Sequence, residues 1–96
     1  MKIKLNVADP EKFIRRCGYG RLENRNTGQV SYVRRLTRLL YPRFHVYIEK
    51  QGDFYMLNLH LDQKQPIYKG VTAHSGEYDG KVVEEEGQRI LSSQVV

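Results

Sequence analysis

The chain has 96 residues, of which 28% are charged and 40% hydrophobic, and a net charge of +5; these figures predict one domain, residues 1–96, with a modest core. No apolar run approaches the roughly 20 residues that span a bilayer, and the alternating N-terminus is unlike a secretory signal, so a membrane protein is not expected. Cys17 is the only cysteine, which excludes an intrachain disulfide and favours a reducing, cytoplasmic location.

The charge is distributed unevenly along the chain. Residues 1–50 hold twelve Lys and Arg against four Asp and Glu, a net of +8, whereas residues 51–96 hold four against seven, a net of −3. An arginine-rich half suits nucleic acid or another polyanion, an acidic protein partner, or a second copy of the chain. The same charges also suit a solvated surface that keeps a small protein soluble.

The first two elements are a strand and a short helix. Apolar and polar residues alternate over residues 2–7, which predicts a half-buried strand. Asp9 can cap a helix over residues 10–17 that begins at Pro10 and that Gly18 can end. A helix of two turns is stable only when its apolar side packs on a sheet.

A turn is predicted in the middle of the basic half. Gly28 suits the left-handed position of a three-residue loop closed by Arg25 and Gln29. Strands would then occupy residues 19–25 and 29–35. This register pairs Leu22 with Tyr32 and Arg21 with Val33.

Part of this hairpin is similar to a known family. The run Gly18-Tyr19-Gly20-Arg21-Leu22, followed after the turn by Val30-Ser31-Tyr32-Val33, resembles the paired strands of cold-shock nucleic-acid-binding domains. The resemblance covers residues 18–33; Arg21 stands where the family has an aromatic residue, and Tyr32 is one place out of step. It supports the hairpin and does not establish membership of the family.

A helix is the alternative interpretation of residues 31–41. Its apolar side would consist of Tyr32, Leu36, Leu39 and Leu40, with Pro42 stopping it. We favour the strand, and a helical turn at residues 36–41 is compatible with it.

The clearest element is a hairpin of strands 43–49 and 54–62. With Gln51 and Gly52 as a two-residue loop, every second cross-strand pair is apolar or aromatic, and this agreement between turn and pattern fixes the register. The predicted core face consists of Phe44, Val46, Ile48, Tyr55, Leu57, Leu59 and Leu61.

The opposite face of this hairpin carries an unusual polar cluster. Its members are Arg43, His45, Tyr47, Asn58 and His60. The predicted register places His45 beside Asn58 and Arg43 beside His60. Such a cluster can bind a phosphate, a carboxylate, a base edge or a metal ion, although polar residues are also what a water-facing sheet carries.

A second helix is predicted near the C-terminus. After Asp62 the sequence is irregular for about eighteen residues, with a short strand near Ile67, and a helix over residues 82–92 follows. The three glutamates that begin with Glu84 fit its first turn, and Gly87 would let it approach the sheet closely. The predicted fold is therefore α+β, with an antiparallel sheet of about five strands and both helices on one face.

One candidate site would bind a divalent metal ion. His60, Asp62, His74 and Glu77 offer two imidazoles and two carboxylates, and the first two point the same way on a strand. Their spacing matches no recognised ligand motif. Cys17 lies on the predicted buried side of its helix, so we expect it in the core and not among the ligands. The enzymatic alternative is accordingly a metal-dependent hydrolase or nuclease, and the spacing assigns no Ser/His/Asp arrangement.

The favoured function is a small, non-enzymatic module that binds RNA or DNA and needs no cofactor. Arginines contact phosphates, and exposed tyrosines stack on unpaired bases. The predicted contact residues are Arg21, Tyr32, Arg34, Arg35, Arg38, Arg43 and Tyr47. A protein-interaction module, which meets an acidic partner or a second copy of itself, is the third hypothesis.

Overall fold

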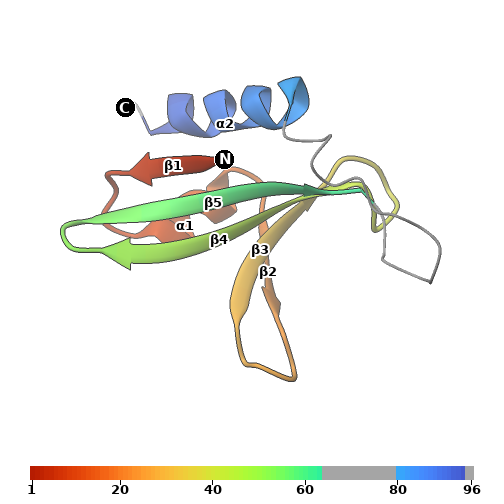
Figure 1. Ribbon diagram of the computed structural model, residues 1–96, viewed down its shortest axis with the longest axis horizontal. Helices are drawn as coiled ribbons and strands as arrows, with labels where there is room; N and C mark the ends of the chain where they lie inside the picture. The colour runs from red at the N-terminus through yellow and green to blue at the C-terminus, as the bar shows by residue number, and fades with distance from the viewer. Residues whose placement is uncertain (64–79, 95–96) are drawn as a thin grey trace.

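The fold is a five-stranded antiparallel sheet with two helices, which confirms the predicted α+β class (Figure 1). The computed structural model describes residues 1–63 and 80–94. The elements are β1 (Lys2–Leu5), α1 (Pro10–Arg16), β2 (Gly20–Glu23), β3 (Val30–Arg35), β4 (Arg43–Gln51), β5 (Phe54–Asp62) and α2 (Lys81–Ser93). Across the sheet the strand order is β1-β5-β4-β3-β2. Neither helix is long and apolar enough to cross a membrane.

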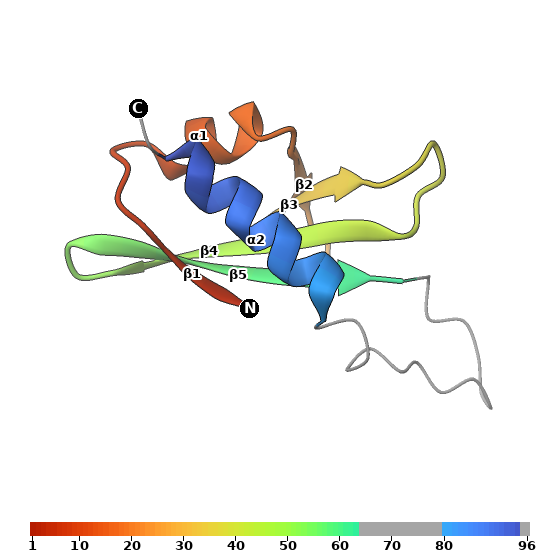
Figure 2. The ribbon, with the colours of Figure 1, turned by 90° about the horizontal axis from the view of Figure 1, so that it is seen from above.

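Both helices lie on the same face of the sheet, as predicted (Figure 2). The core lies between them and the sheet, and its most deeply buried side chains are Leu5, Ile14, Val46, Leu57, Leu59, Val83 and Ile90. No element of the described residues covers the other side, which we call the open face. The β2–β3 hairpin runs at a steep angle to β4 and β5 (Figure 1).

Helix α1 begins and ends where its capping residues predict. The Asp9 side chain accepts a hydrogen bond from the backbone N–H of Lys12 at 3.1 Å, and Pro10 occupies the first turn. Gly18, with φ of +102°, ends the helix in a conformation that favours glycine. Phe13 and Ile14 face the core, so the sheet stabilises a helix too short to stand alone.

The β4–β5 hairpin has the two faces that the sequence predicts, but its strands pair in a different register. Its loop consists of Gly52 and Asp53, because Gly52 takes a positive φ of +61° at the first central position of the turn. The predicted pairs were therefore wrong by two residues along one strand. A shift of two keeps each side chain on its face, so the predicted core face is confirmed.

The β2–β3 hairpin is also confirmed, but its predicted register was wrong by one residue. Asn24 and Gln29 close a four-residue loop. The side-chain oxygen of Asn24 stabilises it by accepting hydrogen bonds from the backbone N–H groups of Asn26 and Thr27 at 2.8 and 3.1 Å. Leu22 therefore lies opposite Ser31 and not opposite Tyr32.

The helical alternative for residues 31–41 was wrong. Residues 30–35 form β3, which pairs with β4, and residues 36–42 form an irregular loop without a helical turn. Pairing on both edges satisfies the backbone of β3, and it buries Tyr32 to 6% exposure against the helices.

A buried carboxylate fastens α2 to the rest of the structure. Glu86 is 5% exposed. The sequence pattern placed it in the first turn of the second helix. Because the helix begins at Lys81, Glu86 lies in the second turn, on the core side. Its oxygens accept hydrogen bonds from the Tyr19 hydroxyl at 2.6 Å and from Arg89 at 2.7 and 2.8 Å. Arg34 of β3 lies 3.7 Å away.

The protonation of this network follows from its geometry. Burial acts to raise the pKa of Glu86, but hydrogen bonds from Arg89 and Tyr19 hold it below its ordinary value of 4.5. Burial and the bond to Glu86 raise the pKa of Tyr19, which keeps its hydroxyl a donor. Arg89 also donates to the Cys17 carbonyl at 2.7 Å and thereby ties α2 to the end of α1.

The contribution of this carboxylate can be measured. Glu86→Gln keeps the side-chain volume but removes the charge that Arg89 and Arg34 face. We expect the free energy of unfolding to fall by about 1.5–3 kcal/mol, the usual contribution of a hydrogen bond to a charged group. Urea denaturation followed by circular dichroism measures it.

The pH dependence supplies the control. Because the folded-state pKa of Glu86 lies below 4.5, its contribution is fully present above pH 4.5 and is lost as the pH falls through the folded pKa. The difference between wild type and Glu86→Gln should therefore shrink as the pH falls below about 4.5. Glu85→Gln on the exposed side should stay within about 0.5 kcal/mol of wild type. A difference that stays constant in acid would contradict this account.

Candidate functional site on the open sheet face

The predicted polar cluster lies on the open face, with partners that differ from those expected. The cross-strand pairs are Arg43 with Asp62, His45 with His60 and Tyr47 with Asn58. The predicted pairs of His45 with Asn58 and of Arg43 with His60 were wrong, because the loop is centred one residue later. The correct register brings Asp62, one step beyond the predicted cluster, beside Arg43.

Three side chains from three neighbouring strands form a continuous hydrogen-bonded relay. His45 of β4 has its Nδ1 atom 2.9 Å from Oδ2 of Asp62 on β5 and its Nε2 atom 2.8 Å from Oγ of Ser31 on β3. Ser31 is 5% exposed, and the side chain of His45 is 13% exposed. We refer to Ser31, His45 and Asp62 as the relay.

Arg43 fixes the charge at the acidic end of the relay. Its Nε atom donates to Oδ2 of Asp62 at 3.2 Å. Partial burial acts to raise the pKa of Asp62, but hydrogen bonds and charge from His45 and Arg43 hold it below its ordinary value. An ionised carboxylate only accepts hydrogen bonds, so the Nδ1 atom of His45 carries a proton. In the neutral imidazole Nε2 is then an acceptor, and Ser31 donates to it.

The ring of Tyr47 packs against the imidazole of His45. The ring centroid of Tyr47 lies 4.6 Å from that of His45 at an interplanar angle of 30°, and His60 meets Tyr47 edge-on at 6.0 Å. His60 is exposed. The relay is therefore held from the side by a tyrosine that itself is partly exposed on the open face.

A cavity of about 390 Å³ opens where the β2–β3 hairpin meets this cluster. Its walls are Leu22, Glu23, Asn24, Arg25, Gln29, Ser31, Arg43, His45 and Tyr47. Both Ser31 and His45 line it, so the serine end of the relay meets a cavity and not the core. Sequence reasoning missed Ser31; the one local signal was a small polar residue between the bulky residues Val30 and Tyr32 of a strand.

The predicted metal ligands are placed only in part. His60 and Asp62 share the open face, but Oδ2 of Asp62 already accepts from Arg43 and His45. His74 and Glu77 lie outside the described residues. Among residues 1–63 and 80–94, no group of three His, Cys, Asp or Glu side chains is arranged to hold a metal ion.

The predicted nucleic-acid contacts separate into two groups. Arg35, Arg43 and Tyr47 lie on the open face, and Arg38 lies exposed in the loop that follows β3. The remaining three lie on the side of the helices: Tyr32 is buried, Arg34 faces Glu86, and Arg21 pairs with Glu23 at 3.3 Å. We therefore remove Tyr32, Arg34 and Arg21 from the candidate surface.

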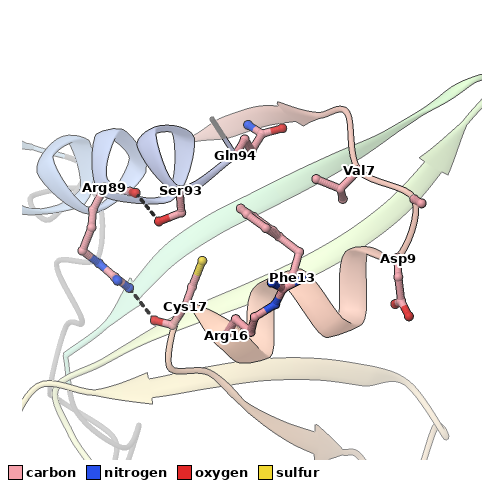
Figure 3. Close-up of a pocket in the computed structure, with 9 residues that line it drawn as sticks. Val7, Asp9, Phe13, Arg16, Cys17, Arg89, Ser93 and Gln94 are labelled. Carbon is pink, nitrogen blue, oxygen red and sulfur yellow. Dashed lines mark hydrogen bonds between the residues drawn. The ribbon is translucent and has the colours of Figure 1, made fainter. Parts of the chain in front are cut away.

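A second cavity, of about 320 Å³, lies between α1 and the end of α2 (Figure 3). Its one cysteine, Cys17, is buried, as predicted, and this burial raises the pKa of the thiol. Arg89, the cationic group on the α2 side, is already bonded to Glu86 and to the Cys17 carbonyl.

No protein-family model, curated protein or solved structure matches the chain. The similarity of residues 18–33 to cold-shock domains accordingly assigns no family. Function has to be argued from the geometry of the open face.

The relay predicts a particular imidazole tautomer. Neutral His45 should carry its proton on Nδ1, because ionised Asp62 accepts it, and Asp62→Asn should reduce this preference, because an amide both donates and accepts. Long-range ¹H–¹⁵N NMR correlations distinguish the two ring nitrogens, with exposed His60 as an internal control. A neutral His45 protonated on Nε2 would contradict the relay.

Proposed function

We propose that the protein binds single-stranded nucleic acid on its open face, as a small non-enzymatic module. The observation that carries the proposal is the division of the sheet: helices cover one face, and the other presents cations beside partly exposed aromatic rings. Proteins often bind unpaired bases on such a face, where aromatic side chains stack on the bases and cations contact the phosphates.

The cations on the open face come from three strands. Lys2 and Lys4 of β1 lie opposite Asn58 and Met56 of β5, and Arg35 of β3 lies opposite Arg43. Lys2, Lys4 and Arg35 are exposed, whereas Arg43 is ion-paired with Asp62. Within residues 1–63 and 80–94, the cations of the open face without an ion-pair partner therefore lie at both edges of the polar cluster, and a phosphate backbone could follow them across the sheet.

The aromatic rings lie between these cations. Tyr47 is partly exposed beside exposed His60, and the Nζ atom of Lys4 lies 4.5 Å above the ring of Phe54. A ring of this kind gives a base a face on which to stack without selecting its identity. We therefore propose weak sequence preference, no cofactor, and a cytoplasmic location in keeping with the buried, unpaired Cys17.

Binding should depend on salt and on the open face. We expect a fluorescent single-stranded oligonucleotide to bind at low salt, with log K falling linearly with log salt by about 0.7 for each phosphate neutralised. Lys4→Glu should weaken binding several-fold and reduce this slope, because it removes one phosphate contact and adds a repulsive charge. Fluorescence anisotropy with single- and double-stranded RNA and DNA measures both quantities.

The matched control is Lys12→Glu. Lys12 is an exposed lysine on α1, on the opposite side of the sheet, so the same charge change there tests net charge alone. Equal weakening by both variants would place binding elsewhere, and no binding at low salt would refute the proposal.

A second candidate function is protein interaction, favoured by the loop between β3 and β4. Leu36, Leu39 and Leu40 are 42%, 70% and 54% exposed within this one loop. Adjacent exposed leucines are typical of a surface that meets another protein. Because the same loop carries Arg38, a second copy or an acidic partner would contact both apolar and cationic groups.

Light scattering tests the self-association that this candidate includes. We expect the mass to rise with concentration in the wild type, and Leu39→Ser combined with Leu40→Ser to keep the protein monomeric, because it removes the apolar contact area. Val82→Ser, at an exposed valine of α2, is the control. A monomer at every concentration would refute self-association through this loop.

A further inference from the structure

The relay on the open face has the geometry of an activated serine. Oγ of Ser31 lies 2.8 Å from Nε2 of His45, and Nδ1 lies 2.9 Å from a carboxylate oxygen of Asp62. Each distance is within hydrogen-bond reach, and each ring nitrogen meets the partner that it meets in serine hydrolases on unrelated folds. Such an arrangement is recognised by geometry and by the role of each group, since chain order differs among those folds.

The strands hold the three side chains without the help of a flexible loop. Ser31, His45 and Asp62 lie on adjacent strands β3, β4 and β5, whose registers are fixed by backbone pairing. Tyr47 packs on the imidazole, and Arg43 holds the carboxylate. Side chains positioned on rigid elements and supported by neighbours meet the requirement for a preorganised reactive group.

The cavity supplies the space that a purely structural hydrogen bond would not need. Its volume of about 390 Å³ lies at the lower end of the range for small-molecule sites. Leu22 gives it an apolar wall, and Arg25 gives it a positive charge, whereas Arg43, which also lines it, is ion-paired with Asp62. An acyl group would contact the apolar wall, and a developing oxyanion would be stabilised by a guanidinium.

We infer that Ser31 is a nucleophile activated by His45 and Asp62, and that the cavity accepts a small carboxylic ester. Oγ of Ser31 attacks the carbonyl carbon while its proton passes to Nε2 of His45, and a tetrahedral oxyanion forms. The intermediate collapses, the bond to the alcohol oxygen breaks, and the alcohol leaves with the proton from Nε2. Water then attacks the acyl-Ser31 ester with His45 as base, releasing the carboxylic acid and restoring the hydroxyl.

A serine-directed reagent tests this inference on the unmodified protein. An alkyl fluorophosphonate forms a bond between phosphorus and the attacking oxygen and expels fluoride, so one adduct per chain should appear, and peptide mass spectrometry should locate it on Ser31. Absence of the adduct at excess reagent overturns the inference without any variant. Release of one equivalent of nitrophenol in a burst from 4-nitrophenyl acetate should accompany acylation of the same residue.

Variants separate activation from mere accessibility. His45→Gln should slow labelling by about 10²- to 10⁴-fold, the usual effect of a general base. Asp62→Asn should also slow it by disturbing the imidazole tautomer. Ser31→Ala should abolish both the adduct and the burst, whereas Ser92→Ala, at an exposed serine of α2 bonded only to the Gln88 carbonyl, should leave them unchanged. Circular dichroism confirms the fold of each variant.

Two further results would overturn the inference. Labelling of Ser31 at the same rate in His45→Gln would show an accessible but unactivated hydroxyl. Ester hydrolysis that persists in Ser31→Ala would assign it to another group, such as the exposed imidazole of His60. Neither result bears on nucleic-acid binding, which is measured separately and does not require the serine.

Discussion

The alternation of side chains along β4 and β5 is the constraint on which the rest of the structure depends. Val46 and Leu59 face each other beneath the helices, and their chain neighbours His45 and His60 face each other on the open side. Because β4 and β5 are the long strands to which β3 and β1 pair, every other strand takes its faces from them. A shift of one residue would therefore exchange the core with the polar cluster.

Charge pairing inside the fold decides which cations remain free. Arg34 faces the buried Glu86 and Arg43 faces Asp62, so two of the eight arginines of residues 1–50 are ion-paired with carboxylates of the acidic half. Part of the opposite charge of the two halves is therefore paired inside the fold. In the described part of the chain, the exposed cations of the open face include the two lysines of β1, Lys2 and Lys4.

Capping residues, turn residues and the alternation of apolar side chains were enough to predict the class of fold, the capped first helix and the core face of the β4–β5 hairpin. The loop was predicted one residue too early, at Gln51 and Gly52, but the resulting shift of two residues in the pairing leaves every side chain on its predicted face. The error at Asn24 was not harmless, because the side chain that closes this loop shifts the register by one residue and places Leu22 opposite Ser31. The relay and the Glu86 network were not predictable, because each depends on pairing between elements distant in sequence, which no local pattern encodes.

The relay and the proposed binding surface meet at one residue. Tyr47 packs on His45, lines the cavity and presents its partly exposed ring to the open face. A base stacked on Tyr47 would lie at the edge of the cavity that contains Ser31, so a bound strand and a small ester would occupy neighbouring parts of one surface. The two proposed activities would be chemically independent, since one requires cations at the edges of the cluster and the other requires a buried hydroxyl at its centre. Sterically they would be coupled, because bound nucleic acid would restrict access to the serine.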